Sequence, residues 1–231
     1  MEYSFINEKI LELFTQLNIK SFPLNCEYIV KELGYNLYKY SELSEEKRIR
    51  CLMVSDESLK LHYNIYYNDN MLVSRIRFSI AHELGHIVLN HGDYLDSEKE
   101  KEANYFASNL IAPRIAIHYA KCKNHIDVSK LFNLSQEAAQ YAFNDYKRWY
   151  RKTVYNKMNV YDKEMYRHFY SIQANCFVYN VKICANCGSE ILNSTQAICS
   201  QCDRSHYEFV SGEDAESDFM IAESQWLYGG I

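Results

Sequence analysis

The sequence predicts an α+β fold in which a small sheet packs on helices. Hydrophobic residues make up 48% of the 231 residues and charged residues 24%, a balance typical of a chain that buries a core. The 7 Gly and 2 Pro are too few for an all-β chain with many turns. Apolar residues at helical spacing run through most of the chain, and short alternating runs precede residue 68.

The first third of the chain contains the predicted sheet. Residues 4–18 are expected to form a helix, because their apolar residues recur with a period of 3.6. Asn25 can cap a short second helix that stops at Gly34. A turn is expected at residues 56–58. Alternating or β-prone residues predict strands at 36–40, 49–55 and about 60–67.

Helices are predicted for most of the remaining chain. One long helix should cover about 72–90, because Asn90-His91-Gly92 is a helix-stop signal. Another should begin near Ser97 and end before Pro113. Composition changes near residue 175, where cysteine pairs appear and helical periodicity fades. Further helices are expected at about 127–133, 136–152 and 161–172.

Charge and the N-terminal segment exclude several classes of protein. The formal net charge of −5 offers no general electrostatic footprint for nucleic acid. No apolar run approaches the roughly 18 residues of a membrane span. The N-terminal segment lacks the basic and apolar regions of a secretory signal. We therefore expect a cytoplasmic protein without membrane attachment, in a reducing compartment that suits metal-bound thiolates.

The motif His82-Glu83-Leu84-Gly85-His86 is an H-E-x-x-H within a predicted helix. Positions i and i+4 share a helix face, so His82 and His86 can bind one zinc ion. Glu83 lies next to that face and can accept a proton from a zinc-bound water. These are the residue types and the spacing of zinc-dependent peptide hydrolysis. The alternative is a helix that carries two surface histidines and a surface glutamate.

A zinc hydrolase of this kind needs a third protein ligand. The carboxylates available on the next predicted helix are those of Glu98, Glu100 and Glu102. Glu100 also completes an S-x-x-E capping box with Ser97, in which it would bond the backbone instead. His91 is the nearest spare histidine, and we interpret it as a residue that interacts with the dipole at the helix end.

Two blocks of the chain resemble the ImmA/IrrE-type metallopeptidases. They are RFSIAHELGHIVLNH, residues 77–91, and EKEANYFASNLIAP, residues 100–113, which matches the family pattern E-x-x-A-N-x-F-A…L-x-x-P. The resemblance covers about residues 20–145 and is clearest at 75–113. It implies a zincin-like core, in which a small sheet packs on the H-E-x-x-H helix and a following Glu-bearing helix.

The resemblance also implies residue roles and an activity. His82, His86 and Glu100 would bind a catalytic zinc. Glu83 would be the catalytic base, and Asn104 would hydrogen-bond a ligand histidine. Family members typically cleave or inactivate a helix-turn-helix repressor, in transcription regulation linked to mobile elements or stress. The alternative hypothesis is a non-catalytic zinc sensor or scaffold that acts by protein–protein interaction in a repressor or toxin–antitoxin complex.

Two CxxC pairs predict a second metal site. They are separated by eleven residues, as in a zinc ribbon, and four thiolates close a tetrahedral site, so this zinc would be structural. Between residues 173 and 231 only Lys182 and Arg204 are cationic, which favours protein docking or stabilisation over direct binding of nucleic acid. The expected cofactors are one catalytic and one structural Zn²⁺. The four cysteines are Cys184, Cys187, Cys199 and Cys202.

The chain is expected to contain three parts. A metallopeptidase domain should cover 1–172, with a core at about 20–145 and a helical extension behind it. A zinc ribbon should cover 173–210 and an acidic tail 211–231. An extended protein substrate usually pairs with an edge strand. The strand from Leu61 to Tyr67 is the candidate edge, and a core strand is the alternative interpretation.

Overall fold

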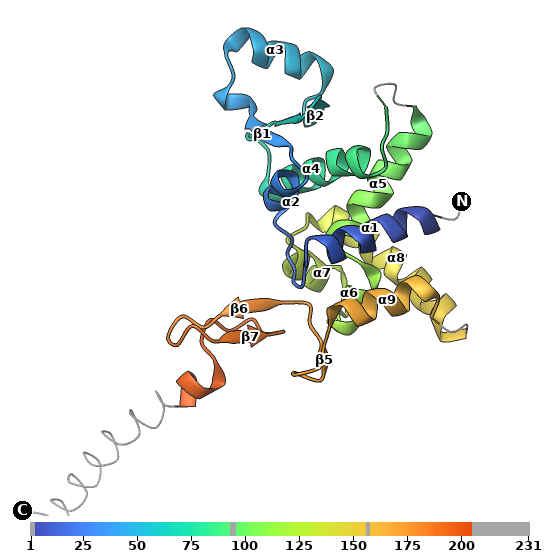
Figure 1. Ribbon diagram of the computed structural model, residues 1–231, viewed down its shortest axis with the longest axis vertical. Helices are drawn as coiled ribbons and strands as arrows, with labels where there is room; N and C mark the ends of the chain where they lie inside the picture. Colours follow the sequence, from blue (N-terminus) through green and yellow to red (C-terminus); the bar gives the residue numbers. More distant parts are fainter. Residues whose placement is uncertain (1–2, 93–95, 156–157, 205–231) are drawn as a thin grey trace, which may run out of the picture. The chain divides into compact units, whose positions relative to one another are not determined.

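The computed structural model describes residues 3–92, 96–155 and 158–204. It divides into two compact units, Met1–Asn180 and Val181–Ile231 (Figure 1). The acidic tail expected at 211–231 and the last residues of the expected ribbon lie outside the described residues. Among the described helices, none has the length and apolar character needed to cross a membrane.

The first unit combines helices with a small sheet, so the predicted α+β class is confirmed. Its helices are α1 (Ser4–Gln16), α2 (Cys26–Glu32), the 3₁₀ helix η1 (Tyr40–Glu42), α3 (Glu45–Val54), α4 (Val73–Val88), α5 (Ser97–Ile111), α6 (Arg114–Tyr119), α7 (His125–Phe132), α8 (Gln136–Tyr155) and α9 (Val160–Phe169). Its strands are β1 (Asn36–Lys39), β2 (Ser58–Leu61), β3 (Asn64–Tyr67), β4 (Tyr170–Ser171) and β5 (Cys176–Phe177).

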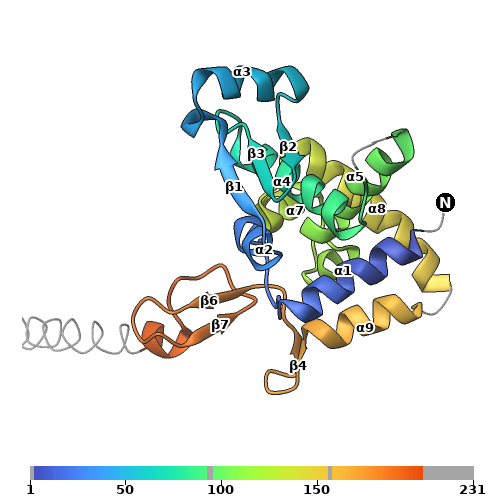
Figure 2. The ribbon, with the colours of Figure 1, turned by 45° about the horizontal axis from the view of Figure 1, so that its top comes forward.

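The main sheet has the order β1-β3-β2 (Figure 2). β1 runs parallel to β3, with Tyr38 opposite Tyr66, and β2 runs antiparallel to β3, with Ser58 opposite Tyr67. β3 is therefore the central strand, and its residues Ile65, Tyr66 and Tyr67 are buried. Within the described residues, the outer side of β2 pairs with no other strand.

Residues 49–55 do not form the expected strand but most of helix α3. The prediction relied on the alternation of Ile49, Cys51 and Met53. Of these only Cys51 is buried, whereas Met53 is 81% exposed, so the alternation does not mark a buried sheet face. Two glutamates in the first turn and the pair Glu46–Arg50 at i,i+4 favour the helix instead.

The single strand expected at about 60–67 is in fact a hairpin of β2 and β3. His62 has a φ of 53°, which reverses the chain between the two strands. Residues 56–58 were expected to form the turn between the predicted strands at 49–55 and 60–67; in the structure this segment instead connects helix α3 to β2, which begins at Ser58. A histidine in the left-handed region gives no clear turn signal in a sequence, because glycine and asparagine usually occupy such positions.

Helices α4 and α5 pack closely at the centre of the first unit. Gly85 and Ala103 face each other there, and a Cβ atom on Gly85 would lie 3.0 Å from the Ala103 Cα. Small residues at this crossing let the two backbones approach. Both helices were predicted within two residues of their observed ends. The residues buried around the crossing are Ile80, Ala81, Leu84, Phe106, Ala107 and Leu110.

The first unit ends later than the residue 172 expected for the peptidase domain. Phe177 in β5 packs against Phe169 and Tyr119, so the β4–β5 hairpin belongs to the aromatic core. The Phe22 backbone N–H donates to the Tyr179 carbonyl at 2.8 Å, and the Asn180 side chain donates to the Phe22 carbonyl at 2.8 Å. These contacts close the unit around its own N-terminal segment.

The second unit contains an antiparallel hairpin of β6 (Val181–Ile183) and β7 (Glu190–Leu192). Cys184 and Cys187 lie in the connection between the two strands, and Cys199 and Cys202 follow β7. Gly188 has a φ of 73°, as expected for the tight turn after the first CxxC pair. Among the described residues of this unit, 181–204, none belongs to a hydrophobic core cluster, and the cysteines hold that place instead.

Candidate active site

Helix α4 presents the H-E-x-x-H motif toward the first turn of α5. His82 and His86 lie one turn apart, and their Nε2 atoms are 3.0 Å apart. Glu100 Oε2 is 3.2 Å from His82 Nε2, and Glu100 Oε1 is 3.5 Å from His86 Nε2. The three expected ligand side chains thus meet at one point.

The spacing of these atoms fits a zinc ion. Nitrogen and oxygen ligands lie about 2.0–2.1 Å from zinc, so two ligands of a tetrahedral site are about 3.4 Å apart. The observed separations of 3.0 to 3.5 Å agree with that geometry. Two imidazoles and one carboxylate also leave a fourth position open, which is the donor set of catalytic rather than structural zinc sites.

The other two candidate carboxylates point elsewhere. Glu98 pairs with Lys101 on the surface at 2.7 Å, and Glu102 lies 3.1 Å from His91 Nε2. The alternative role of Glu100 in a capping box with Ser97 is not observed, because the preceding Asp96 caps α5 and accepts from two backbone N–H groups. Glu100 is therefore free to face the histidines.

Both histidines have a hydrogen-bond partner on the side away from the metal position, Asn104 for His82 and His91 for His86. Asn104 Oδ1 lies 3.1 Å from His82 Nδ1, at the position expected for a residue that supports a ligand. Burial and the neighbouring imidazole of His82 lower the pKa of His86 to about 3. His86 is therefore neutral near pH 7, as a metal ligand must be.

Glu83 is buried beside the histidines. Glu83 is 6% exposed, and the hydroxyl of Ser58 donates to Glu83 Oε1 at 2.8 Å. Burial raises the pKa of Glu83, while the Ser58 hydrogen bond and His82 oppose that effect. A carboxylate with a raised pKa is a stronger base, as proton transfer near neutral pH requires.

A cleft of about 980 Å³ opens over these residues. Strand β2 and helix α3 form one wall, and α4 with α5 form the other. Lys60 of β2 lines the cleft, and its charge acts on both Glu83 and His86. Arg75 of α4 pairs with Glu57, which directly precedes β2 and also accepts from the Ser79 hydroxyl of α4 at 2.8 Å.

The strand along the cleft is not the one expected from the sequence. The candidate edge from Leu61 to Tyr67 consists mostly of β3, which is central in the sheet. The edge strand is β2, which precedes the predicted segment and lines the cleft along its whole length. The difference arises from the hairpin at His62, which places the earlier strand outside the later one.

Two residues of the site were missed in the sequence. Ser58 lies 25 positions before Glu83, and no motif links two residues at that distance. His91 was interpreted as a residue at the helix dipole, but it is buried between His86 and Glu102. A signal for His91 was present, since a spare histidine directly follows the helix-stop residue Asn90.

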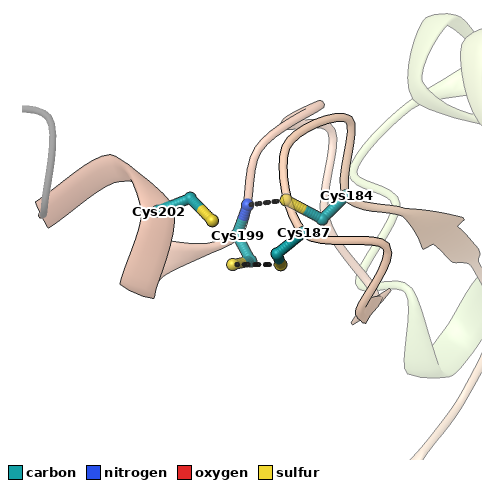
Figure 3. A group of neighbouring side chains, drawn as sticks. All are labelled: Cys184, Cys187, Cys199 and Cys202. Atoms are coloured by element: carbon teal, nitrogen blue, oxygen red, sulfur yellow. Dashed lines mark hydrogen bonds between the residues drawn. The ribbon is translucent and has the colours of Figure 1, made fainter.

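The four cysteines of the two CxxC motifs gather in the second unit (Figure 3). Cys187 Sγ and Cys199 Sγ are 3.6 Å apart, close to the roughly 3.8 Å expected for two thiolates on a tetrahedral zinc. The backbone N–H groups of Cys187 and Cys199 lower the pKa of Cys184 to about 6. Thiolates at this spacing fit a structural zinc with no open position.

Comparison with known proteins agrees with the geometry of the first unit. Residues 34–144 match the family model of the IrrE N-terminal-like domain, which belongs to a family of peptidases. This segment is an IrrE N-terminal-like domain. The match contains α4, α5, the sheet and all the residues around the candidate zinc position. The comparison with curated proteins gives no match.

One solved structure is similar over part of the chain. It is described as a Mycobacterium tuberculosis transcriptional regulator, with 14% sequence identity and a TM-score of 0.42. The alignment covers 58% of this chain and 44% of that protein. The segment that matches the peptidase family lies within the first unit, and the cysteine unit lies outside it.

Proposed function

We propose that this chain is a zinc-dependent endopeptidase of regulatory type. The observation that carries the proposal is the convergence of His82, His86 and Glu100 beside the buried carboxylate of Glu83. A purely structural zinc site needs no general base next to its ligands, and it usually has no open position. The match to a peptidase family supports the same activity.

Each side chain has a definite task in this mechanism. His82, His86 and Glu100 would hold a zinc ion, which supplies a Lewis acid and lowers the pKa of a coordinated water. Glu83 accepts the proton of the attacking water and later donates it to the amine of the leaving peptide. Ser58 holds the carboxylate of Glu83 in place through its hydroxyl.

Strand β2 is the proposed binding edge for the substrate. Its outer side has unpaired backbone groups in the described part of the chain, and it borders the cleft. An extended peptide can add to such an edge by main-chain hydrogen bonds. Lys60, on the same face of β2 as Ser58, places a positive charge beside the bound peptide.

The proposed substrate is a helix-turn-helix repressor or an antitoxin-like protein. This part rests on the resemblance of the two sequence blocks to the ImmA/IrrE-type metallopeptidases. We further propose one catalytic and one structural Zn²⁺, the second held by the four paired cysteines. The cysteine unit would then dock a protein or stabilise the chain, since few cations are available there for nucleic acid.

The proposal is tested by comparing newly formed protein N-termini in host cells that express wild type or E83Q at matched levels. Glu83→Gln keeps the size and the acceptor oxygen for Ser58 but cannot take a proton. Glu98→Gln is the matched control, because Glu98 is an exposed glutamate on α5 that pairs only with Lys101 in the described structure. We expect a new N-terminus with wild type and E98Q that is absent with E83Q.

The identity of the cleaved protein then tests the finer part. Cleavage of a helix-turn-helix repressor would support the regulatory role, and cleavage of unrelated proteins would contradict it. A biological effect that E83Q retains in full, with no cleavage by wild type, would refute the peptidase and favour a zinc sensor or scaffold.

A further inference from the structure

His86, His91 and Glu102 form a hydrogen-bonded chain behind the candidate zinc position. His86 Nδ1 lies 2.9 Å from His91 Nδ1, and His91 Nε2 lies 3.1 Å from Glu102 Oε2. The side chains of the two histidines are only 3% and 6% exposed. Ring nitrogens buried to this extent need partners within the protein. The directions of these hydrogen bonds are therefore fixed by the two ends of the chain.

The end of helix α4 explains how His91 reaches this place. Asn90 has a φ of 55°, and its N–H donates to the Ile87 carbonyl at 3.1 Å. The His91 N–H donates to the His86 carbonyl at 2.9 Å. These two bonds and the left-handed residue make a Schellman motif, which turns the backbone over the last helical turn. The backbone alone makes this cap, so it does not require a histidine side chain.

The donors and acceptors of the chain can be assigned from Glu102. An ionised carboxylate only accepts hydrogen bonds, so His91 must donate from Nε2. A neutral His91 then has an unprotonated Nδ1, which accepts from Nδ1–H of His86. His86 is consequently held in the tautomer whose Nε2 lone pair is free. That atom is the one that faces His82 and Glu100.

We propose that His91 and Glu102 are positioning residues that hold His86 in its metal-binding tautomer and orientation. This inference rests on the proposed function, because it requires a metal ion at His86 Nε2. Asn104 gives His82 the corresponding support from a single amide oxygen. His86 receives it through two residues, because His91 lies between it and the carboxylate of Glu102. Such outer partners fix ring orientation and the basicity of the ligand.

The test measures metal affinity in the full-length protein rather than proteolysis alone. Co²⁺ replaces Zn²⁺ in the titration, because a site of two imidazoles and a carboxylate gives weak d–d bands. The cysteine site gives strong thiolate-to-cobalt charge-transfer bands and serves as an internal control. Four variants are compared. H91F removes the acceptor of the His86 hydrogen bond, whereas in H91N the amide oxygen can take the place of Nδ1. E102Q changes the far end of the chain, and E98Q is the surface control.

We expect H91F to weaken Co²⁺ binding at the histidine site about 10- to 100-fold, the range for loss of an outer partner. E102Q should weaken it about 10-fold, because its amide can donate to His91 and thereby reverse the direction of the hydrogen bonds that lead to His86. H91N should remain within about 3-fold of wild type, and E98Q should equal wild type. The charge-transfer bands should be the same in all variants.

Two results would overturn the inference. If H91F and E102Q bind Co²⁺ as tightly as E98Q, then His91 and Glu102 do not position His86. If H91F binds Co²⁺ as tightly as wild type while H91N does not, the histidine ring acts by packing alone. If H91F does not fold, the Co²⁺ affinities of E102Q and E98Q still test the inference, because the Glu102 side chain reaches the surface. If wild type shows no d–d absorption beyond the part that grows in step with the thiolate charge-transfer bands, the proposed zinc site itself is refuted.

Discussion

Replacement of Gly85 by alanine probes the contact on which the zinc geometry depends. Gly85 lies in the interior of α4, between the two histidines of the motif and opposite Ala103 of α5. A Cβ atom there would be 3.0 Å from the Ala103 Cα, 3.1 Å from its carbonyl oxygen and 3.3 Å from its Cβ. Two of these three atoms belong to the backbone, so no rotation of a side chain can relieve the overlap.

Two opposing effects set the expected size of the change. Alanine is favoured over glycine inside a helix by about 1 kcal/mol. Restoring ordinary contact requires α4 and α5 to separate by roughly 0.5 Å, and overpacking of this kind costs about 1–3 kcal/mol. We therefore expect G85A to lower the free energy of unfolding by about 1 kcal/mol. The separation would also move Glu100 away from the histidines and weaken zinc binding.

Urea denaturation of the metal-free protein and a Zn²⁺ titration against a chelator measure the two effects. Gly92→Ala is the matched control, since within the described structure an added Cβ there meets no atom within 4 Å apart from its chain neighbours. G92A should leave both quantities nearly unchanged. If G85A were instead more stable than wild type by about 1 kcal/mol with unchanged zinc affinity, helix propensity would dominate and the close α4–α5 contact would be irrelevant to the site.

Three other substitutions test separate parts of the structure. S58A should raise the pKa of Glu83 further, because the carboxylate loses its hydrogen-bond donor. The acidic limb of the pH–rate profile should then move to higher pH, and kcat/KM should fall about 10-fold. An acidic limb at the wild-type pH would contradict this. Burial raises the pKa of Asp162, which accepts from Trp149 at 2.8 Å, so the folded state binds its proton more tightly than the unfolded chain. D162N should therefore match wild type in stability well below the ordinary carboxyl pKa of about 3.9 and become increasingly more stable than wild type as the pH rises, which melting curves at several pH values will show. C199S should lower the bound zinc from two ions to one, as elemental analysis measures, while activity of the first unit is retained; loss of both ions would show that the sites are coupled.

The helices of the site could be predicted because their signals are local. The stop signal at Asn90 and the break at Pro113 mark the ends of α4 and α5, and both ends agree with the structure. The two histidine ligands and Glu83 were accessible for the same reason, since the H-E-x-x-H spacing is a property of one helix. Glu100 required more, because three glutamates on one helix compete and only the family resemblance separated them in the sequence.

The β2–β3 hairpin and α3 could not be predicted by the same reasoning. In α3 the alternating residues are mostly exposed, so their period-two spacing does not indicate the half-buried strand that it usually predicts. In the hairpin the reversal occurs at His62, a residue that seldom adopts a positive φ. The consequence for the site was direct, because Ser58 reaches Glu83 only when β2 is the outer strand.

The way the first unit closes on itself makes the two units separable as genetic modules. The last hydrogen bonds of the first unit join Tyr179 and Asn180 to Phe22, in the segment just after α1. A chain that stops after Asn180 would keep every one of these bonds, while one that stops at 172 would lose Phe177 from the aromatic core. We therefore expect that a different C-terminal module can be joined after Asn180, by recombination or in the laboratory, without breaking the bonds that close the first unit.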